Sequence, residues 1–165
     1  MNPSASSGQA LLQTKLQIPI IRSPSLVRRS RLFEKLNGGL SGTVTLVAAP
    51  AGFGKTTLLA EWVRDGARFP GAGAAPATAW LSLDEQDNDP ARFLAYLTAA
   101  LERVHGQALR AAPLQHEGPL PGMSLEAAIT PLINALGRAP QPFLLVLDDY
   151  HLIQEPHIHQ ALTFL

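Results

Sequence analysis

The sequence predicts an α/β fold in which helices cover both faces of a parallel sheet. Three short segments are apolar throughout, and stretches with apolar residues at helical spacing separate them. Strands of a parallel sheet have this composition, because crossover helices bury them on both sides. The chain has 165 residues, which is enough for one domain with a hydrophobic core.

The N-terminal region is expected to contain little regular structure. Residues 1–14 are predicted to be a disordered N-terminus, because Met1 to Gln9 is polar and rich in small residues. A short helix is expected from about Arg31 to Leu36, with Ser30 as its N-cap. Either Gly38 or Gly39 would end this helix.

The first expected strand runs from Thr43 to Ala49 and consists of β-branched and apolar residues. The helix after it runs from Lys55 to about Arg64, and one face carries Leu58, Leu59, Trp62 and Val63. A loop rich in Gly, Pro and Ala leads to the second expected strand, Thr78 to Leu83.

The next helix is expected from Ala91 to about Val104. Asp89 is a suitable N-cap and Pro90 a suitable first helical residue. Its apolar face carries Phe93, Leu94, Leu97 and Leu101. A second loose region is expected from Gly106 to Gly122.

The C-terminal part continues the alternation. Ser124 is expected to cap a helix to about Leu136, and Pro131 inside it predicts a kink or a late start. The third strand is Pro142 to Leu147, and a last helix that begins at Pro156 is expected to continue to the end of the chain.

A glycine turn between the first strand and its helix predicts a phosphate-binding loop. Ala49 to Thr56, "APAGFGKT", matches G-x-x-x-x-G-K-[ST] except that alanine takes the first glycine position. A polyphosphate is held best by several backbone N–H groups at the positive end of a helix. The candidate nucleotide-binding residues are Pro50, Ala51, Gly52, Phe53, Gly54, Lys55, Thr56 and Thr57. With this loop, the predicted fold class is a P-loop NTPase three-layer sandwich. The alternative for the loop itself is a plain strand-to-helix turn whose lysine is solvated.

Two acids follow the third strand, at the sheet edge where open α/β sheets bind their ligands. Asp148 is the candidate that holds Mg²⁺ together with the Thr56 hydroxyl. Asp149 is the candidate catalytic residue, orienting a water against the γ-phosphate. The alternative is that Asp149 only caps or solvates the turn.

Composition excludes several functions. Lys+Arg and Asp+Glu are both 13, so no net positive field attracts DNA or an anionic membrane surface. The chain has no cysteine, which suits a reducing compartment. No signal peptide or membrane-spanning run is visible, so we expect a cytoplasmic protein without a membrane partner.

Other charged or metal-binding residue types have simpler explanations. "DEQDNDP" is expected to cap helices and turns rather than to bind a metal, although Asp84 is also a candidate for contact with phosphates or a neighbouring subunit. His157 and His159 would point away from each other on a helix, which argues against zinc. The basic cluster Arg22, Arg28, Arg29 and Arg31 is either solvated or part of a segment that crosses the nucleotide base.

Three segments in the right order carry a family resemblance: "APAGFGKTTLLAEW", "AWLSLDEQDNDPARFLAYLTAAL" and "LLVLDDYHLIQEPHIHQALTFL". They resemble the N-terminal ATPase domain of the MalT-like large ATP-dependent LuxR-type transcriptional regulators, which belong to the STAND class of P-loop ATPases. The resemblance covers about Lys15 to Leu165 and leaves the two Gly/Pro-rich loops unmatched.

The resemblance implies ATP or ADP and Mg²⁺ as cofactors. It implies the roles given above for Lys55, Thr56, Asp148 and Asp149, and it adds Val27 and Arg28 of "SLVRRSRL" as candidates for the adenine pocket. Family members are switches: ATP and an inducer favour a self-associating, DNA-binding form, and slow hydrolysis resets it.

The resemblance also implies that residues 15–165 are the N-terminal part of a longer domain. The fourth strand, the sensor domain and the DNA-binding domain of the family would then lie in other parts of the polypeptide. Because that fourth strand would lie between the first and third, the 165 residues alone are expected to be marginally stable, to bind ATP weakly and to hydrolyse it negligibly.

Three functions are weighed. The first is a regulatory ATP switch in a transcriptional activator, and the second is a stand-alone NTPase enzyme, either a phosphotransferase or a nucleic-acid motor. No phosphate-binding arginines are placed for a kinase, and the neutral charge argues against a motor. The third, a degenerate interaction scaffold, is opposed by the intact lysine, threonine and aspartates.

Overall fold

The computed structural model describes residues 11–21, 29–68, 75–110, 124–138 and 142–165. Most of the expected N-terminal disorder, Val27, Arg28 and residues 111–123 of the second loose region lie outside them. The chain divides into two compact units, each described by itself. The sheet unit comprises residues up to 17, 79–141 and 145–165, and the loop unit comprises residues 18–78 and 142–144.

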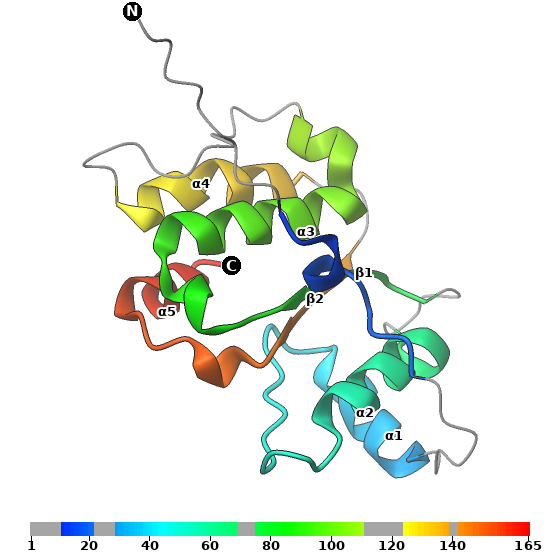
Figure 1. Cartoon of the computed structure of the whole chain (residues 1–165). Helices are drawn as coiled ribbons and strands as arrows, with labels where there is room; N and C mark the ends of the chain where they lie inside the picture. The colour runs from blue at the N-terminus through cyan, green and yellow to red at the C-terminus, as the bar shows by residue number, and fades with distance from the viewer. Residues whose placement is uncertain (1–10, 22–28, 69–74, 111–123, 139–141) are drawn as a thin grey trace, which may run out of the picture. The chain divides into compact units, whose positions relative to one another are not determined.

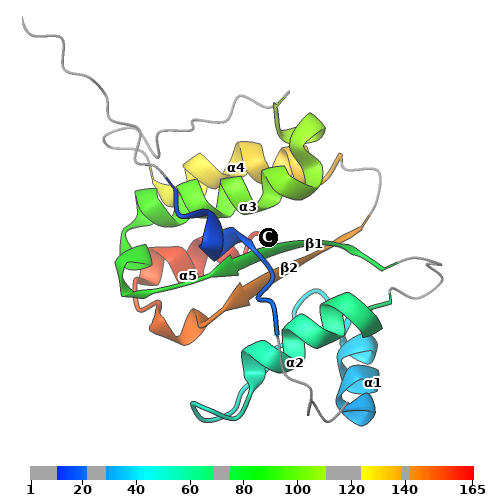
Figure 2. The ribbon, with the colours of Figure 1, turned by 45° about the vertical axis from the view of Figure 1, so that its right-hand side comes forward.

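In the described residues, two neighbouring strands form the sheet: β1 (Ala77–Ser82) and β2 (Phe143–Asp148). They lie side by side and run in the same direction (Figure 2). Just beyond β1, Leu83 donates its N–H to the carbonyl oxygen of Asp148 at 3.0 Å. Ala79, Trp80 and Leu81 are each at most 1% exposed, so the middle of β1 is part of the core. The predicted α/β class, its parallel sheet and the second and third strands are confirmed.

The predicted first strand, Thr43 to Ala49, is wrong. The structure assigns no strand to these residues, and Val44 and Leu46 are 84% and 83% exposed. A strand needs a neighbour for its backbone N–H and C=O groups. In the described part of the chain β1 and β2 pair with each other, so this apolar run has no ladder partner.

Among its described residues, the sheet unit has three α-helices: α3 (Pro90–Arg110), α4 (Leu125–Leu136) and α5 (Pro156–Leu162). In both ribbon views α3 and α4 lie on the same side of the two strands (Figure 1, Figure 2). The predicted apolar face of α3 is buried, with Phe93, Leu97 and Leu101 at 0% exposure. No helix in the described ranges is long and apolar enough to cross a membrane.

The ends of these helices follow their capping residues. Asp89 accepts a hydrogen bond from the N–H of Arg92 at 2.8 Å, and Ser124 accepts one from the N–H of Ala127 at 3.2 Å. Both are the predicted N-caps. The predicted end of this helix at about Val104 coincides with a break at His105, whose φ of −123° and ψ of 32° are not helical. The helix nevertheless continues to Arg110, so the loose region expected from Gly106 is wrong for residues 106–110.

Two expectations about helices differ from the structure. α4 begins directly after Ser124 and continues through Pro131, so the late start is wrong. α5 begins at Pro156 as predicted but ends at Leu162. The N–H of Thr163 donates to the carbonyls of Gln160 and Ala161 and closes the last turn.

The loop unit contains α1 (Ser30–Gly39) and α2 (Lys55–Glu61), and α2 continues as one π-helical stretch, Trp62–Gly66. Asn37 joins α1 to the end of this run. Its side-chain oxygen accepts from the Trp62 indole at 2.9 Å and from the Arg68 N–H at 3.1 Å, and its amide nitrogen donates to the Gly66 carbonyl at 3.0 Å. α1 begins at Ser30 itself with Arg29 as N-cap, so Ser30 is not the N-cap.

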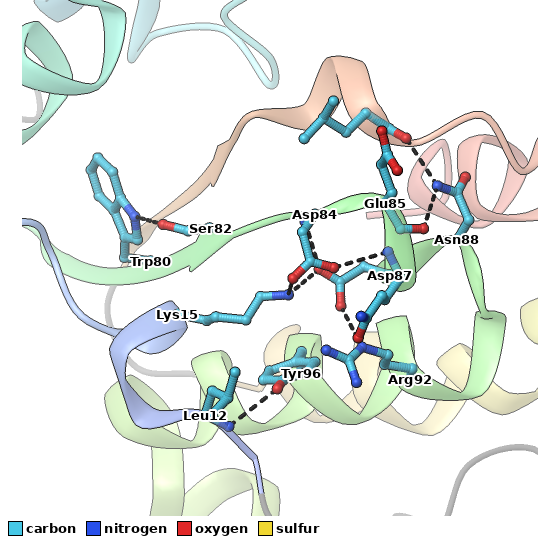
Figure 3. Close-up of polar contacts among 12 residues, drawn as sticks. Leu12, Lys15, Trp80, Ser82, Asp84, Glu85, Asp87, Asn88, Arg92 and Tyr96 are labelled. Atoms are coloured by element: carbon cyan, nitrogen blue, oxygen red, sulfur yellow. Dashed lines mark hydrogen bonds and ion pairs between the residues drawn. The ribbon is translucent and has the colours of Figure 1, made fainter.

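A cluster of buried charges holds the N-terminal segment of the sheet unit (Figure 3). Gln13 and Thr14, placed by the sequence in the disordered N-terminus, begin a 3₁₀ turn that ends at Leu16. Lys15 in this turn is 7% exposed, and its ammonium contacts Asp87 and, at 3.0 Å, Asp84. Asp87 is fully buried and also pairs with Arg92 Nε at 3.0 Å.

Tyr96 of α3 completes this cluster. The Lys15 ammonium lies 4.5 Å from the centroid of the Tyr96 ring, a distance at which the ring face attracts a cation. The Tyr96 hydroxyl accepts a hydrogen bond from the N–H of Leu12 at 3.1 Å. The N-terminal segment is therefore bound through its backbone and its lysine.

Replacing Lys15 by alanine should destabilise the chain. Removing one of the two cations beside buried Asp87 leaves that carboxylate incompletely compensated, and we expect a loss of about 3 kcal/mol in the free energy of unfolding. Chemical denaturation at pH 7 measures the loss, and Lys35→Ala on the exposed surface of α1 is the control.

The same variant should also change the acid unfolding. Burial alone would raise the pKa of Asp84, but the hydrogen bond and charge of Lys15 outweigh it, so the pKa lies below its ordinary value of 3.8. Such a carboxylate stabilises the fold above its unfolded pKa, and this contribution is lost as pH falls through the folded pKa. The wild-type chain should lose more stability than Lys15→Ala below about pH 4. Equal losses would contradict the role given to Lys15.

Candidate functional site

The predicted phosphate loop has the backbone of a tight glycine turn. Gly52 and Gly54 have φ values of +81° and +75°, in the left-handed region that a side chain disfavours. Gly54 is the N-cap of α2, and its carbonyl accepts from the N–H of Leu58 at 2.9 Å. The chain thus turns twice and enters a helix at Lys55. Of the predicted site residues, Pro50 to Phe53 are exposed and Gly54 to Thr57 are half-buried.

The Lys55 side chain folds back over this loop. Its ammonium donates to the carbonyl oxygens of Ala49 at 2.8 Å and of Pro50 at 3.2 Å. Both partners are neutral, so these two bonds leave the positive charge uncompensated. The arrangement places a cation at the N-terminal end of a helix, where the helix dipole also favours an anion.

Arg29 brings a second cation to the loop; from the sequence, its basic cluster was either solvated or part of a segment that crosses the nucleotide base, and contact with this loop was not predicted. Its guanidinium donates to the carbonyl of Phe53 at 3.4 Å and would lie 3.7 Å from a Cβ placed on Gly54. In the sequence, Arg29 is one of four arginines in a basic cluster, of which the family resemblance singled out Arg28. The position of Arg29 just before α1 is what brings it to the loop. That contact depends on how α1 packs in the loop unit, which the sequence pattern does not report.

The acid pair lies in the sheet unit, where β2 ends. Asp148 is the last residue of β2 and is 5% exposed. Asp149 has a φ of +56°, which aspartate tolerates better than most residues. Its N–H donates to the Asp148 carboxylate at 3.2 Å, and its own carboxylate lies 3.9 Å from His151 Nδ1. The first acid is thus buried at the strand end and the second is more accessible.

The other charged candidates have structural partners. Asp84 and Asp87 form a capping box around the turn Glu85–Asn88, so the predicted capping role of "DEQDNDP" is confirmed. His157 Nδ1 lies 2.5 Å from the Glu155 carboxylate, and His159 Nδ1 lies 2.5 Å from the Tyr150 hydroxyl. The hydrogen bond from His157 lowers the pKa of Glu155 below its ordinary value of 4.5.

The residues of the loop fit the phosphates of a nucleotide, and each unit separately contains an oxygen ligand suited to magnesium. Two glycines in left-handed conformation open the loop for close approach of an anion, and two cations point at its backbone. Thr56 lies in the first turn of α2, and Asp148 offers a buried carboxylate at a strand end. Hydroxyl and carboxylate oxygens are the ligands that Mg²⁺ prefers.

A glycine turn that leads from an apolar segment into a helix, together with acids at a strand end, defines a P-loop α/β domain. Residues 27–152 match the family model of the AAA domain, which is more than half of the chain. The chain therefore belongs to the AAA domain family.

Its curated relatives are regulators of transcription. The chain is 37% identical over 154 residues to the HTH-type transcriptional regulator MalT of Cronobacter sakazakii. It is 38% and 39% identical to the proteins of the same name from Yersinia enterocolitica and Serratia proteamaculans. Each match covers 93% of this chain but 16% of the relative. The predicted resemblance to MalT-like regulators is confirmed, for a chain that spans about a sixth of their length.

Gly54→Ala should strain the loop. A residue with a Cβ pays about 1–2 kcal/mol in the left-handed region, so the melting temperature should fall. Gly38→Ala is the matched control: Gly38 lies within α1, and a Cβ there would meet nothing within 4 Å. Alanine should be neutral or slightly stabilising at that position. Thermal unfolding of both variants tests this, and a Gly54→Ala chain as stable as wild type would contradict the loop conformation.

Proposed function

We propose that this chain is the ATP-binding switch domain of a MalT-like transcriptional activator. The observation that carries the proposal is the loop at the start of α2, with its left-handed glycines and the Lys55 ammonium folded over it. The family match to an AAA domain and the similarity to transcriptional regulators support it.

The loop would bind the phosphates of ATP or ADP. Backbone N–H groups from Pro50 to Thr57, apart from the proline itself, would surround them, and Lys55 would exchange its carbonyl partners for phosphate oxygens. Arg29 would supply a second, forked contact. Val27 and Arg28 remain the candidates for the adenine pocket.

Thr56 and Asp148 would hold the magnesium ion. When bound, the ion would neutralise part of the charge on the outer phosphates. Asp149 would be the catalytic residue: its accessible carboxylate can accept a hydrogen bond from a water molecule and orient it. We propose that hydrolysis is slow and serves as a reset rather than as a metabolic reaction.

The switch requires ATP to prefer one conformation, because equal affinity for two forms would shift nothing. We propose that ATP and a small-molecule inducer together favour a self-associating form. DNA would be bound by another part of the polypeptide, in line with the name of the similar regulators and with the neutral charge of this chain. Such a protein would act in the cytoplasm.

Lys55→Ala should abolish ATP binding. Charge-assisted hydrogen bonds are worth about 1.5–3 kcal/mol each, so the loss of contacts to two phosphates should weaken binding about 100-fold or more. Arg29→Ala should weaken it about tenfold by the same reasoning. Calorimetric titration of the full-length protein with Mg-ATP measures both, with Arg31→Ala, exposed on α1, as control. Wild-type affinity in Lys55→Ala would disprove the site.

Asp149→Asn should separate binding from hydrolysis. Asparagine tolerates the left-handed backbone and keeps the side-chain shape, but its amide cannot act as a base. We expect hydrolysis per bound ATP to fall about 100-fold, with ATP affinity close to wild type. Parallel measurement of both in the full-length protein tests this. Loss of ATP binding would contradict the role, and many turnovers per second in the wild type would favour an enzyme over a switch.

A further inference from the structure

The turn Glu85–Asn88 after β1 is held by its own hydrogen bonds and by the buried charge cluster. Asp84 accepts from the N–H of Gln86 at 2.9 Å, and Asp87 accepts from the N–H of Asp84 at 2.8 Å (Figure 3). Asp87 is in turn fixed by Lys15 and Arg92. The backbone of Asn88, the last residue of this turn, is therefore held in place.

The side-chain amide of Asn88 joins its own turn to the segment after β2. Its amide nitrogen donates to the carbonyls of Glu85 at 3.0 Å and Leu152 at 2.9 Å. Its oxygen accepts from the N–H groups of Gln154 at 2.6 Å and Glu155 at 3.0 Å. An amide side chain has two N–H donors and one oxygen with two lone pairs, so its capacity is filled. If the nitrogen and oxygen of the amide were exchanged, its NH₂ group would face the N–H groups of Gln154 and Glu155, and its oxygen would face two carbonyls. The hydrogen bonds therefore determine the orientation of the amide.

The held segment starts at the acid pair. Leu152, whose carbonyl binds Asn88, donates its own N–H to the carbonyl of Asp149 at 3.0 Å. Asp149 is the one non-glycine residue with positive φ in the described ranges. A backbone in this sparsely populated region persists only when its surroundings hold it there. Two successive hydrogen bonds thus connect Asn88 to the backbone of Asp149.

We propose that Asn88 is a positioning residue for Asp149, setting the direction of its carboxylate through Leu152 and the 3₁₀ turn Tyr150–Leu152. This inference rests on the proposed catalytic role of Asp149. Asn88 itself touches neither nucleotide nor water in this scheme. Its effect is on the rate of hydrolysis and not on the phosphate loop, which belongs to the other unit.

A purely structural role is the competing explanation, because Asn88 also binds the N–H of Glu155, the N-cap of α5. A structural role would lower stability whatever residue stands at 149. A positioning role would disappear once the carboxylate at 149 is removed. The two therefore differ in a double-mutant cycle.

The test uses the full-length protein with Asn88→Ala, Asn88→Asp and Asp149→Asn, and the double variant Asn88→Ala/Asp149→Asn. Gln86→Ala, exposed on the same turn, is the control. Hydrolysis is expressed per bound ATP, so that unfolded protein does not count. We expect Asn88→Ala to lower this rate at least tenfold with ATP affinity close to wild type, and to have no further effect in Asp149→Asn. Asn88→Asp keeps the acceptor for Gln154 and Glu155 but cannot donate to the Leu152 carbonyl, so it should lower the rate as alanine does.

Hydrogen exchange of the nucleotide-free protein gives a readout apart from activity. The N–H groups of Gln154 and Glu155 should exchange faster in Asn88→Ala and unchanged in Gln86→Ala. Wild-type hydrolysis in Asn88→Ala, or an equal loss in the Asp149→Asn background, would overturn the inference alone. An Asp149→Asn protein that hydrolyses ATP normally, or a wild type that does not bind ATP, would overturn both this inference and the proposed function.

Discussion

The complete burial of the Asp87 carboxylate is the constraint on which the sheet unit depends. An ionised carboxylate removed from water costs several kcal/mol unless cations and hydrogen-bond donors surround it. Lys15, Arg92 and the N–H of Asp84 provide this environment. They come from the N-terminal segment, the start of α3 and the end of β1, so one buried charge requires three parts of the chain to meet. The rigid turn that results also carries Asn88.

Local signals in the sequence predicted most elements of the fold. Asp89 with Pro90, and Ser124, mark helix starts through contacts within four residues, and β1 and β2 are recognisable as apolar runs. The strand at Thr43 to Ala49 was mispredicted because a strand also needs a partner far away in sequence. Composition reports the tendency to form a strand but not the presence of its neighbour.

The residues of the candidate site also fall into two groups, those with a local sequence signal and those placed by distant contacts. The loop from Pro50 to Thr57 and the acid pair were visible because their motifs are continuous in sequence. Arg29 and Asn88 were not, since their partners lie 24 and 64 to 67 residues away. Neither residue stands in a recognisable motif. Arg29 is one of the four arginines of the basic cluster, and Asn88 is an asparagine in an acidic turn. Their roles come from tertiary contacts alone.

The energetics of the loop limit how the proposed switch could work. The left-handed glycines and the two carbonyl bonds of Lys55 arrange the loop for phosphate. Phosphate binding exchanges neutral acceptors for charged ones, and only the difference between these two sets of bonds contributes to affinity. A conformational change can be driven only by the part of that difference which one conformation realises and the other does not. In the proposed function, Asp148 and Asp149 would contribute this part, through the magnesium ion and the attacking water.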